Sequence, residues 1–169
     1  MNENYTIISG TNRAGSNTRK VAEHYERLLQ QKQIASRVLS LEGWSYLEKN
    51  PAFEQLEKEI LVPTHKFIFI SPEYNGSIPG VLKVMMDITD YKKVWWGKKA
   101  LLTGVATGRS GNLRGMEHLT GILNYLRVFV HPNRLPISSV DKLFNSQGEL
   151  SDSATVKAIA TQVDEFIQF

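Results

Sequence analysis

The sequence contains no cysteine. Disulfide bonds, thiolate metal sites and cysteine nucleophiles are therefore excluded, and any redox chemistry must be carried by a bound cofactor. The sequence also lacks an apolar run that approaches the roughly 18 residues of a membrane-spanning helix. Residues 1–4 carry no basic charge and lead directly into an apolar segment. No signal peptide is therefore indicated, and a cytoplasmic location is the default expectation.

Clustered positive charge is absent as well. The 20 lysine and arginine residues outnumber the 17 aspartate and glutamate residues, which gives a formal net charge of +3, but they are scattered along the chain. A nucleic-acid-binding stripe is thus not indicated, whereas a mild positive field suits a small anionic ligand such as a phosphorylated cofactor. No metal site is expected, because the four histidines lie far apart and share no ligand spacing.

Apolar runs alternate with amphipathic stretches along the chain, which is typical of repeated β-α units. Strands are expected at residues 5–9, 34–41, 67–70, 100–106 and 128–130. The segment 132–152, rich in Ser, Asn, Asp and Pro, is expected to be an irregular surface connection before the last helix. The β-α unit repeated five times predicts one α/β domain over residues 1–169. Its expected fold is a flavodoxin-like three-layer sandwich with a five-stranded parallel sheet of order 2-1-3-4-5.

The loop after the first strand is a candidate anion site. Residues 9–18 contain two glycines, several hydroxyls and Arg13, and they lead into a helix. Free N–H groups at a helix N-terminus bind anions, and Arg13 adds positive charge. The loop is not a nucleotide-hydrolase P-loop, because Ser16 stands where lysine is required, and Asn12 replaces the second glycine of a dinucleotide fingerprint. An ordinary turn capped by Ser16 or Asn17 is the alternative.

The loops after the third and fourth strands are expected at the same edge of the sheet. Residues 71–80 offer backbone amides and Tyr74 to a flat, largely apolar ring with polar edges, such as an isoalloxazine; a plain turn with Tyr74 half buried is the alternative. Residues 106–115 contain three glycines that let the backbone approach a ligand closely. Arg109 and Arg114 in this loop suit a nicotinamide-cofactor phosphate or an acidic partner subunit, or they stay solvated.

Together these loops resemble the signatures of the NADPH-dependent FMN reductase family, flavodoxin-like proteins that include quinone, chromate and azo-dye reductases. Residues 10–18 are similar to the family's phosphate loop, with Thr11 and Thr18 in place of the more usual Ser and Asn. Residues 72–83 resemble the second signature without a departure. Residues 108–115 resemble the third flavin-side loop, and residues 144–150 the acidic turn before the last helix. The resemblance spans nearly the whole chain.

The resemblance implies an oxidoreductase that passes a hydride from NADPH or NADH through bound FMN to a small acceptor, such as a flavin or a quinone. It also implies a homodimer or homotetramer with the flavin near the subunit interface. No protein nucleophile is needed, so no catalytic residue is assigned. The residues assigned to the cofactor are Thr11, Arg13, Ser16, Asn17 and Thr18 at the phosphate, Pro72, Glu73, Tyr74, Asn75 and Gly76 beside the ring, and Thr107, Gly108 and Gly111 at its N1–C2=O side.

A flavodoxin-like electron carrier, or a non-catalytic FMN-binding module, is the main alternative from another class. Carriers of that kind are typically acidic, whereas the net charge of this chain is positive, which favours the enzyme. The pair Trp95-Trp96 lies among lysines, a combination that can bind single-stranded nucleic acid. We expect instead a packed connection before the fourth strand, at a subunit contact.

Overall fold

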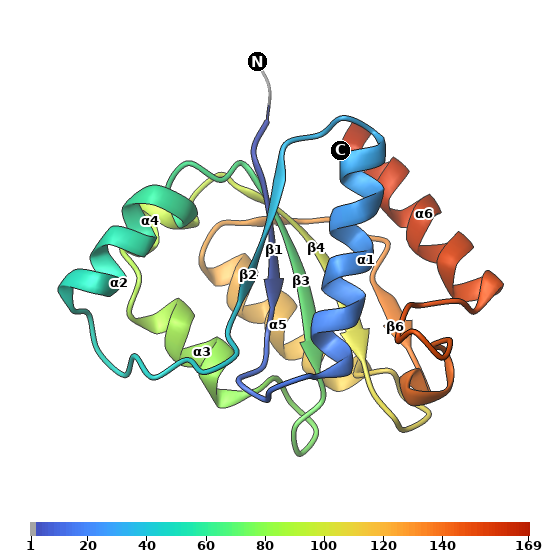
Figure 1. Cartoon of the computed structure of the whole chain (residues 1–169). Helices are drawn as coiled ribbons and strands as arrows, with labels where there is room; N and C mark the ends of the chain where they lie inside the picture. The colour runs from blue at the N-terminus through green and yellow to red at the C-terminus, as the bar shows by residue number, and fades with distance from the viewer. Residues whose placement is uncertain (1–2) are drawn as a thin grey trace.

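The computed structural model describes residues 3–169, which form a parallel sheet with helices on both faces (Figure 1). The sheet has the strand order β2-β1-β3-β4-β5, and every neighbouring pair along it is parallel. The predicted flavodoxin-like topology is therefore confirmed. The strands are β1 (Tyr5–Ser9), β2 (Ser36–Ser40), β3 (Lys66–Pro72), β4 (Lys99–Val105) and β5 (Phe129–Val130).

The helices form the two outer layers of the sandwich (Figure 1). One layer consists of α1 (Asn17–Gln31) and α6 (Ser153–Gln168). The other consists of α2 (Pro51–Leu56), α3 (Gly80–Asp87), α4 (Tyr91–Val94) and α5 (Leu113–Tyr125). The helix expected at residues 53–61 corresponds to α2 and a π-helical turn, Glu57–Leu61, that continues it. Within residues 3–169, each helix is too short or too polar to cross a bilayer.

The central strands are buried on both faces because helices cover both sides of the sheet. Successive side chains of a strand point to opposite sides and so enter the two cores in turn. Ile7, Ile68 and Leu101 are neighbours across β1, β3 and β4, and they belong to the core beneath α1 and α6. The next residues along each strand, among them Ile8 and Phe69, belong to the core beneath α2 to α5. This double burial explains why residues 67–70, the centre of β3, form an unbroken apolar run in the sequence.

The segment after β5 departs from the prediction. Residues 132–152 were expected to be an irregular surface connection, but Leu135–Ile137 forms a sixth strand, β6, which pairs in parallel with β4. Ile137 and Val140 are buried, with 2% and 1% of their surface exposed. The prediction of a surface segment is therefore wrong for these residues.

Two short strands share the outer edge of β4, which is the physical reason for this difference. β5 pairs only with Lys99 and Ala100 at the start of β4, so the carboxyl-terminal half of β4 is left to β6. Three residues give too little pattern for a strand to be recognised. Pro136, at the centre of β6, also argues against a strand except at a sheet edge.

Candidate functional site

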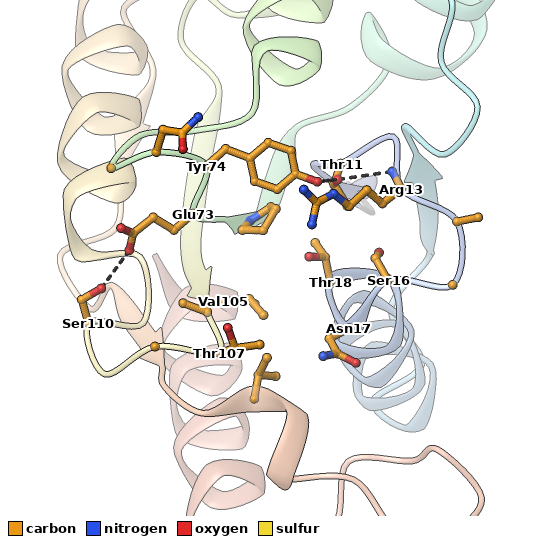
Figure 2. A pocket seen from close by; sticks show the side chains of 18 residues that line it. Thr11, Arg13, Ser16, Asn17, Thr18, Glu73, Tyr74, Val105, Thr107 and Ser110 are labelled. Atoms are coloured by element: carbon orange, nitrogen blue, oxygen red, sulfur yellow. Dashed lines mark hydrogen bonds between the residues drawn. The ribbon is translucent and has the colours of Figure 1, made fainter.

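A cavity of about 540 Å³ opens at the carboxyl edge of the sheet, between the loops that follow β1, β3 and β4 (Figure 2). Its volume lies in the range of small-molecule and cofactor sites. All but one of the residues assigned from the sequence line it: Thr11, Arg13, Ser16, Asn17, Thr18, Pro72, Glu73, Tyr74, Asn75, Gly76, Thr107 and Gly108. The expected meeting of three loops in one place is therefore confirmed, while the role of each residue toward a cofactor stays a prediction.

Gly111 is the assigned residue that does not line the cavity. It is buried, and a Cβ atom added to it would lie 2.7 Å from Cβ of Pro136 and 2.8 Å from the backbone nitrogen of Ile137. Its backbone therefore packs against β6. Lining residues that sequence reasoning missed are Ala14, Gly15, Val105, Ala106, Ser110 and Val140. Val140 could not be found, because it belongs to the segment taken for a surface connection.

The N-terminus of α1 forms one end of the cavity. Ser16 is its N-cap, and the Ser16 hydroxyl accepts a hydrogen bond from the backbone N–H of Arg19 at 3.1 Å. The N–H groups of Asn17 and Thr18 belong to the first turn, so they have no carbonyl partner within the helix. No acidic residue lies in this turn. Of the two caps that the alternative interpretation offered, Ser16 or Asn17, Ser16 is the one observed. The same turn presents free donors and the positive end of the helix dipole to the cavity.

The loop after β3 contains a tight hairpin. Tyr74 and Ser77 exchange two backbone hydrogen bonds, of 2.9 and 3.1 Å. The two residues between them, Asn75 and Gly76, have φ angles of 52° and 78°. A two-residue turn with positive φ at both positions favours the sequence Asn-Gly, because these residues tolerate left-handed backbone best. The hairpin fixes the backbone of Tyr74 at the wall of the cavity.

The side chain of Tyr74 reaches from this hairpin to the loop after β1 (Figure 2). Its hydroxyl lies 2.6 Å from the Thr11 hydroxyl, and the Arg13 guanidinium lies 4.5 Å from the centre of the Tyr74 ring. Residues more than 60 positions apart in the chain are thus in direct contact across the cavity. The sequence assigned Tyr74 to the ring of a cofactor and gave no sign of its contact with the first loop.

Asn112 anchors the loop after β4, and no role had been assigned to it from the sequence. It is fully buried with φ = 66°, a left-handed conformation that asparagine adopts more readily than most residues. Its side-chain carbonyl accepts a hydrogen bond from the N–H of Gly115 at 3.1 Å and so caps α5. Its side-chain amide donates to the backbone carbonyl of Ser71 at 2.8 Å. One side chain therefore ties the third loop to the end of β3.

Of three charged residues in or beside the third loop, Glu73, Arg109 and Arg114, only Glu73 lines the cavity. The hydroxyl of Ser110 donates to the carboxylate of Glu73 at 2.8 Å, at the end of the cavity away from Arg13 (Figure 2). Arg109 and Arg114 are exposed and are not among the lining residues. The loop therefore places neither arginine inside the cavity.

The tryptophan pair does not form a stacking platform. Trp95 is fully buried, and its indole N–H donates to the hydroxyl of Thr89 at 2.7 Å. Trp96 is 36% exposed, and the guanidinium of Arg127 lies 4.1 Å from its ring centre. The expected packed connection before β4 is confirmed for Trp95.

Comparison with known proteins points to the same family as the sequences of the three loops. Residues 4–142 match the sequence model of a family described as NADPH-dependent FMN reductase. The chain is 35% identical to the NAD(P)H-dependent FMN reductase PA1204 of Pseudomonas aeruginosa over 118 residues, which are 67% of this chain and 62% of that protein. It is 26% identical to a 2-hydroxy-1,4-benzoquinone reductase of a Burkholderia species, over 76% of this chain and 72% of that protein. The alignment thus spans less than two thirds of the first relative.

Solved structures share the fold at lower identity. The flavoenzyme NAD(P)H:(acceptor) oxidoreductase FerB of Paracoccus denitrificans superimposes with a TM-score of 0.81 at 19% identity, over 98% of this chain and 96% of that chain. A flavodoxin from the domain Archaea superimposes with a TM-score of 0.68 at 15% identity, over 98% and 97% of the two chains. Because an oxidoreductase and a flavodoxin both match, the fold alone does not separate an enzyme from an electron carrier.

Proposed function

The chain belongs to the NADPH-dependent FMN reductase family, and from this premise we propose that it passes a hydride from NADPH or NADH through FMN to a small acceptor such as a flavin or a quinone. The observation that carries the proposal is the cavity at the carboxyl edge of the sheet, where the three loops with family-like sequence meet. The names of the two curated relatives, an FMN reductase and a benzoquinone reductase, support the choice of acceptors.

The two ends of the cavity suit the two chemically different parts of FMN. The capped N-terminus of α1 and the Arg13 guanidinium would hold the phosphate, since both favour an anion. The carboxylate of the lining, Glu73, lies at the other end, where it would not repel that phosphate. Pro72, Val105 and Val140 give apolar surface for the ring.

The chain itself binds and orients the reactants, while FMN supplies the hydride chemistry when it is bound. Donors at Thr107, Gly108 and Ser110, the residues of the third loop that line the cavity, would stabilise negative charge at the N1–C2=O side of a reduced flavin ring. The N–H groups of Asn17 and Thr18 would fix the phosphate and thereby set the position of the ring. No side chain is required as a nucleophile.

The proposal predicts a yellow protein, or an apoprotein that becomes yellow when FMN is added. Anaerobic addition of NADPH or NADH is expected to bleach the visible absorbance of the flavin, and a quinone added afterwards is expected to restore it. The measurement is an absorbance titration followed by stopped-flow reduction. A protein that neither binds FMN nor accelerates its reduction would contradict the proposed function.

The same experiment separates the electron carrier from the enzyme. A carrier or passive flavin-binding module would bind FMN but would not be reduced by a nicotinamide cofactor at an appreciable rate. The net charge of +3 favours the enzyme, because a positive field attracts anionic nicotinamide and flavin cofactors. Comparing NADPH with NADH in this assay also establishes the preferred donor.

A homodimer or homotetramer is the proposed assembly. A second cavity of about 1070 Å³ is lined by residues of α3, α4 and α5, and its aromatic members are Tyr91, Trp96 and Tyr125. Tyr125 is 86% exposed. Aromatic side chains and arginine are enriched in the buried centres of interfaces, and Arg127 lines the same cavity. Ser77 extends this cavity to the hairpin, so a second copy seated here would lie next to the FMN site.

Tyr125→Glu is expected to shift the protein toward monomers, because it would place a charge in the desolvated centre of this interface. Sedimentation velocity over a range of protein concentrations measures the shift. Leu47→Glu is the matched control, since Leu47 is also an exposed apolar residue, at 80%, but lies outside this cavity. A monomeric wild-type protein, or equal behaviour of the two variants, would contradict this assignment of the interface.

A further inference from the structure

Tyr74 contacts two of the residues assigned to the phosphate, Thr11 and Arg13. Its hydroxyl lies 2.6 Å from the hydroxyl of Thr11, and its ring lies under the guanidinium of Arg13 at 4.5 Å (Figure 2). Thr11 is only 2% exposed, so its hydroxyl has few competing partners in solvent. Tyr74 itself is held by the Asn75-Gly76 turn, which fixes its backbone.

The hydrogen bonds of Thr11 determine what its hydroxyl can still do. A hydroxyl has one donor and two acceptor positions. The backbone N–H of Arg13 donates to the Thr11 oxygen at 3.3 Å, which uses one acceptor position. A phenol is a stronger donor than an aliphatic alcohol, so the Tyr74 hydroxyl is the favoured donor in the second bond. Thr11 is then left with its own O–H, a donor suited to a phosphate oxygen, which only accepts.

The contact with Tyr74 also leaves the N–H donors of Arg13 available to a phosphate. A guanidinium over an aromatic face is attracted by the ring without using its N–H groups in that contact. Among residues 3–169, no carboxylate forms an ion pair with Arg13. The Tyr74 ring thus holds the guanidinium at the cavity while its donors stay available for an anion.

We propose that Tyr74 is a positioning residue that prepares Thr11 and Arg13 for the phosphate of FMN, and thereby makes the site selective for FMN over the unphosphorylated flavin. This inference rests on the proposed FMN site. Tyr74 would act on the phosphate through its contact with Thr11, in addition to its predicted place beside the flavin ring.

The test is a double-mutant cycle on FMN affinity, measured by fluorescence titration of the apoprotein. Tyr74→Phe removes the hydroxyl but keeps the ring under Arg13, and Thr11→Val removes the Thr11 hydroxyl at nearly constant volume. Each single variant is expected to bind FMN about three- to tenfold more weakly than the wild type, the effect of one lost hydrogen bond. The double variant is expected to bind no more weakly than the weaker single variant, because both changes interrupt the same chain of contacts.

Riboflavin gives the second readout, because it lacks the phosphate. Tyr74→Phe is expected to leave riboflavin affinity within about twofold of the wild type. Additive effects of the two substitutions on FMN, no effect of Tyr74→Phe on FMN, or an equal loss for FMN and riboflavin would each overturn the inference. If riboflavin binds too weakly for its affinity to be measured, the double-mutant cycle with FMN is by itself the test of the role of Tyr74.

Two controls keep this result distinct from other failures. A wild-type protein that binds neither flavin would refute the proposed function itself, whereas a wild type that binds FMN leaves only the role of Tyr74 in question. Urea unfolding of each variant separates a change in binding from a change in folding, since a shifted FMN affinity at unchanged stability reports on the site.

Discussion

Arg13→Ala is expected to weaken FMN binding by about 10- to 150-fold, the effect of losing a hydrogen bond of about 1.5–3 kcal/mol to a charged group. The guanidinium lines the cavity beside the N-terminus of α1, and its donors are free of any ion pair within the described residues 3–169. Because the interaction is with the phosphate, riboflavin affinity is expected to change little. Titration of the apoprotein with both flavins measures this difference.

Arg19→Ala is the matched control for this prediction. Arg19 lies on α1 close to the same loop, but its guanidinium pairs with Glu23 at 2.7 Å and does not line the cavity. The variant loses the same formal charge without losing a donor to the ligand, so its FMN affinity is expected to stay within about threefold of the wild type. A loss below threefold in Arg13→Ala would remove Arg13 from the phosphate site.

Arg13→Lys separates charge from geometry. A lysine keeps the positive charge but has no planar fork, so it binds a phosphate as a point charge and not in a bidentate manner. We expect its FMN affinity to lie between those of the wild type and Arg13→Ala. An Arg13→Lys variant as weak as Arg13→Ala would indicate that the shape of the guanidinium, including its position over Tyr74, matters more than its charge.

Features that are determined by residues close together in the chain could be predicted from the sequence. The unbroken apolar run of β3 predicted a doubly buried central strand, and its polar continuation, residues 72–76, lines the cavity as expected. The helix cap could be narrowed to Ser16 or Asn17 because capping is decided within one turn of chain, and Ser16 is the one observed. The edge at which the three loops meet followed from the parallel order of the strands alone.

Contacts between distant segments could not be predicted in the same way. The bond from Tyr74 to Thr11 and the bond from Asn112 to the carbonyl of Ser71 each depend on the final placement of two loops. β6 was missed because its pairing depends on how early β5 ends, which no local pattern records. These long-range contacts decide how the loops of the site are held.

Gly104→Ala is expected to lower the free energy of unfolding by about 3 kcal/mol, at the upper end of the usual cost of overpacking. Gly104 lies in β4, and a Cβ atom added to it would stand 2.2 Å from the backbone carbonyl oxygen of Gly111. That oxygen belongs to the third loop, which Asn112 ties to β3. A backbone atom cannot rotate away as a flexible side chain can, so the loop itself must shift. Urea unfolding measures the loss, with a lower midpoint at unchanged slope.

Gly80→Ala is the matched control, and its expected effect has the opposite sign. Gly80 begins α3, is exposed, lines neither cavity, and has no atom within 4 Å of an added Cβ. Alanine restricts the unfolded chain more than glycine does, so this variant is expected to gain about 0.4–1 kcal/mol. Because Thr107 and Gly108 belong to the loop that Gly104→Ala displaces, FMN affinity is expected to fall in that variant and not in Gly80→Ala. Full stability together with wild-type affinity in Gly104→Ala would mean that the close approach of β4 to the third loop does not position the cavity.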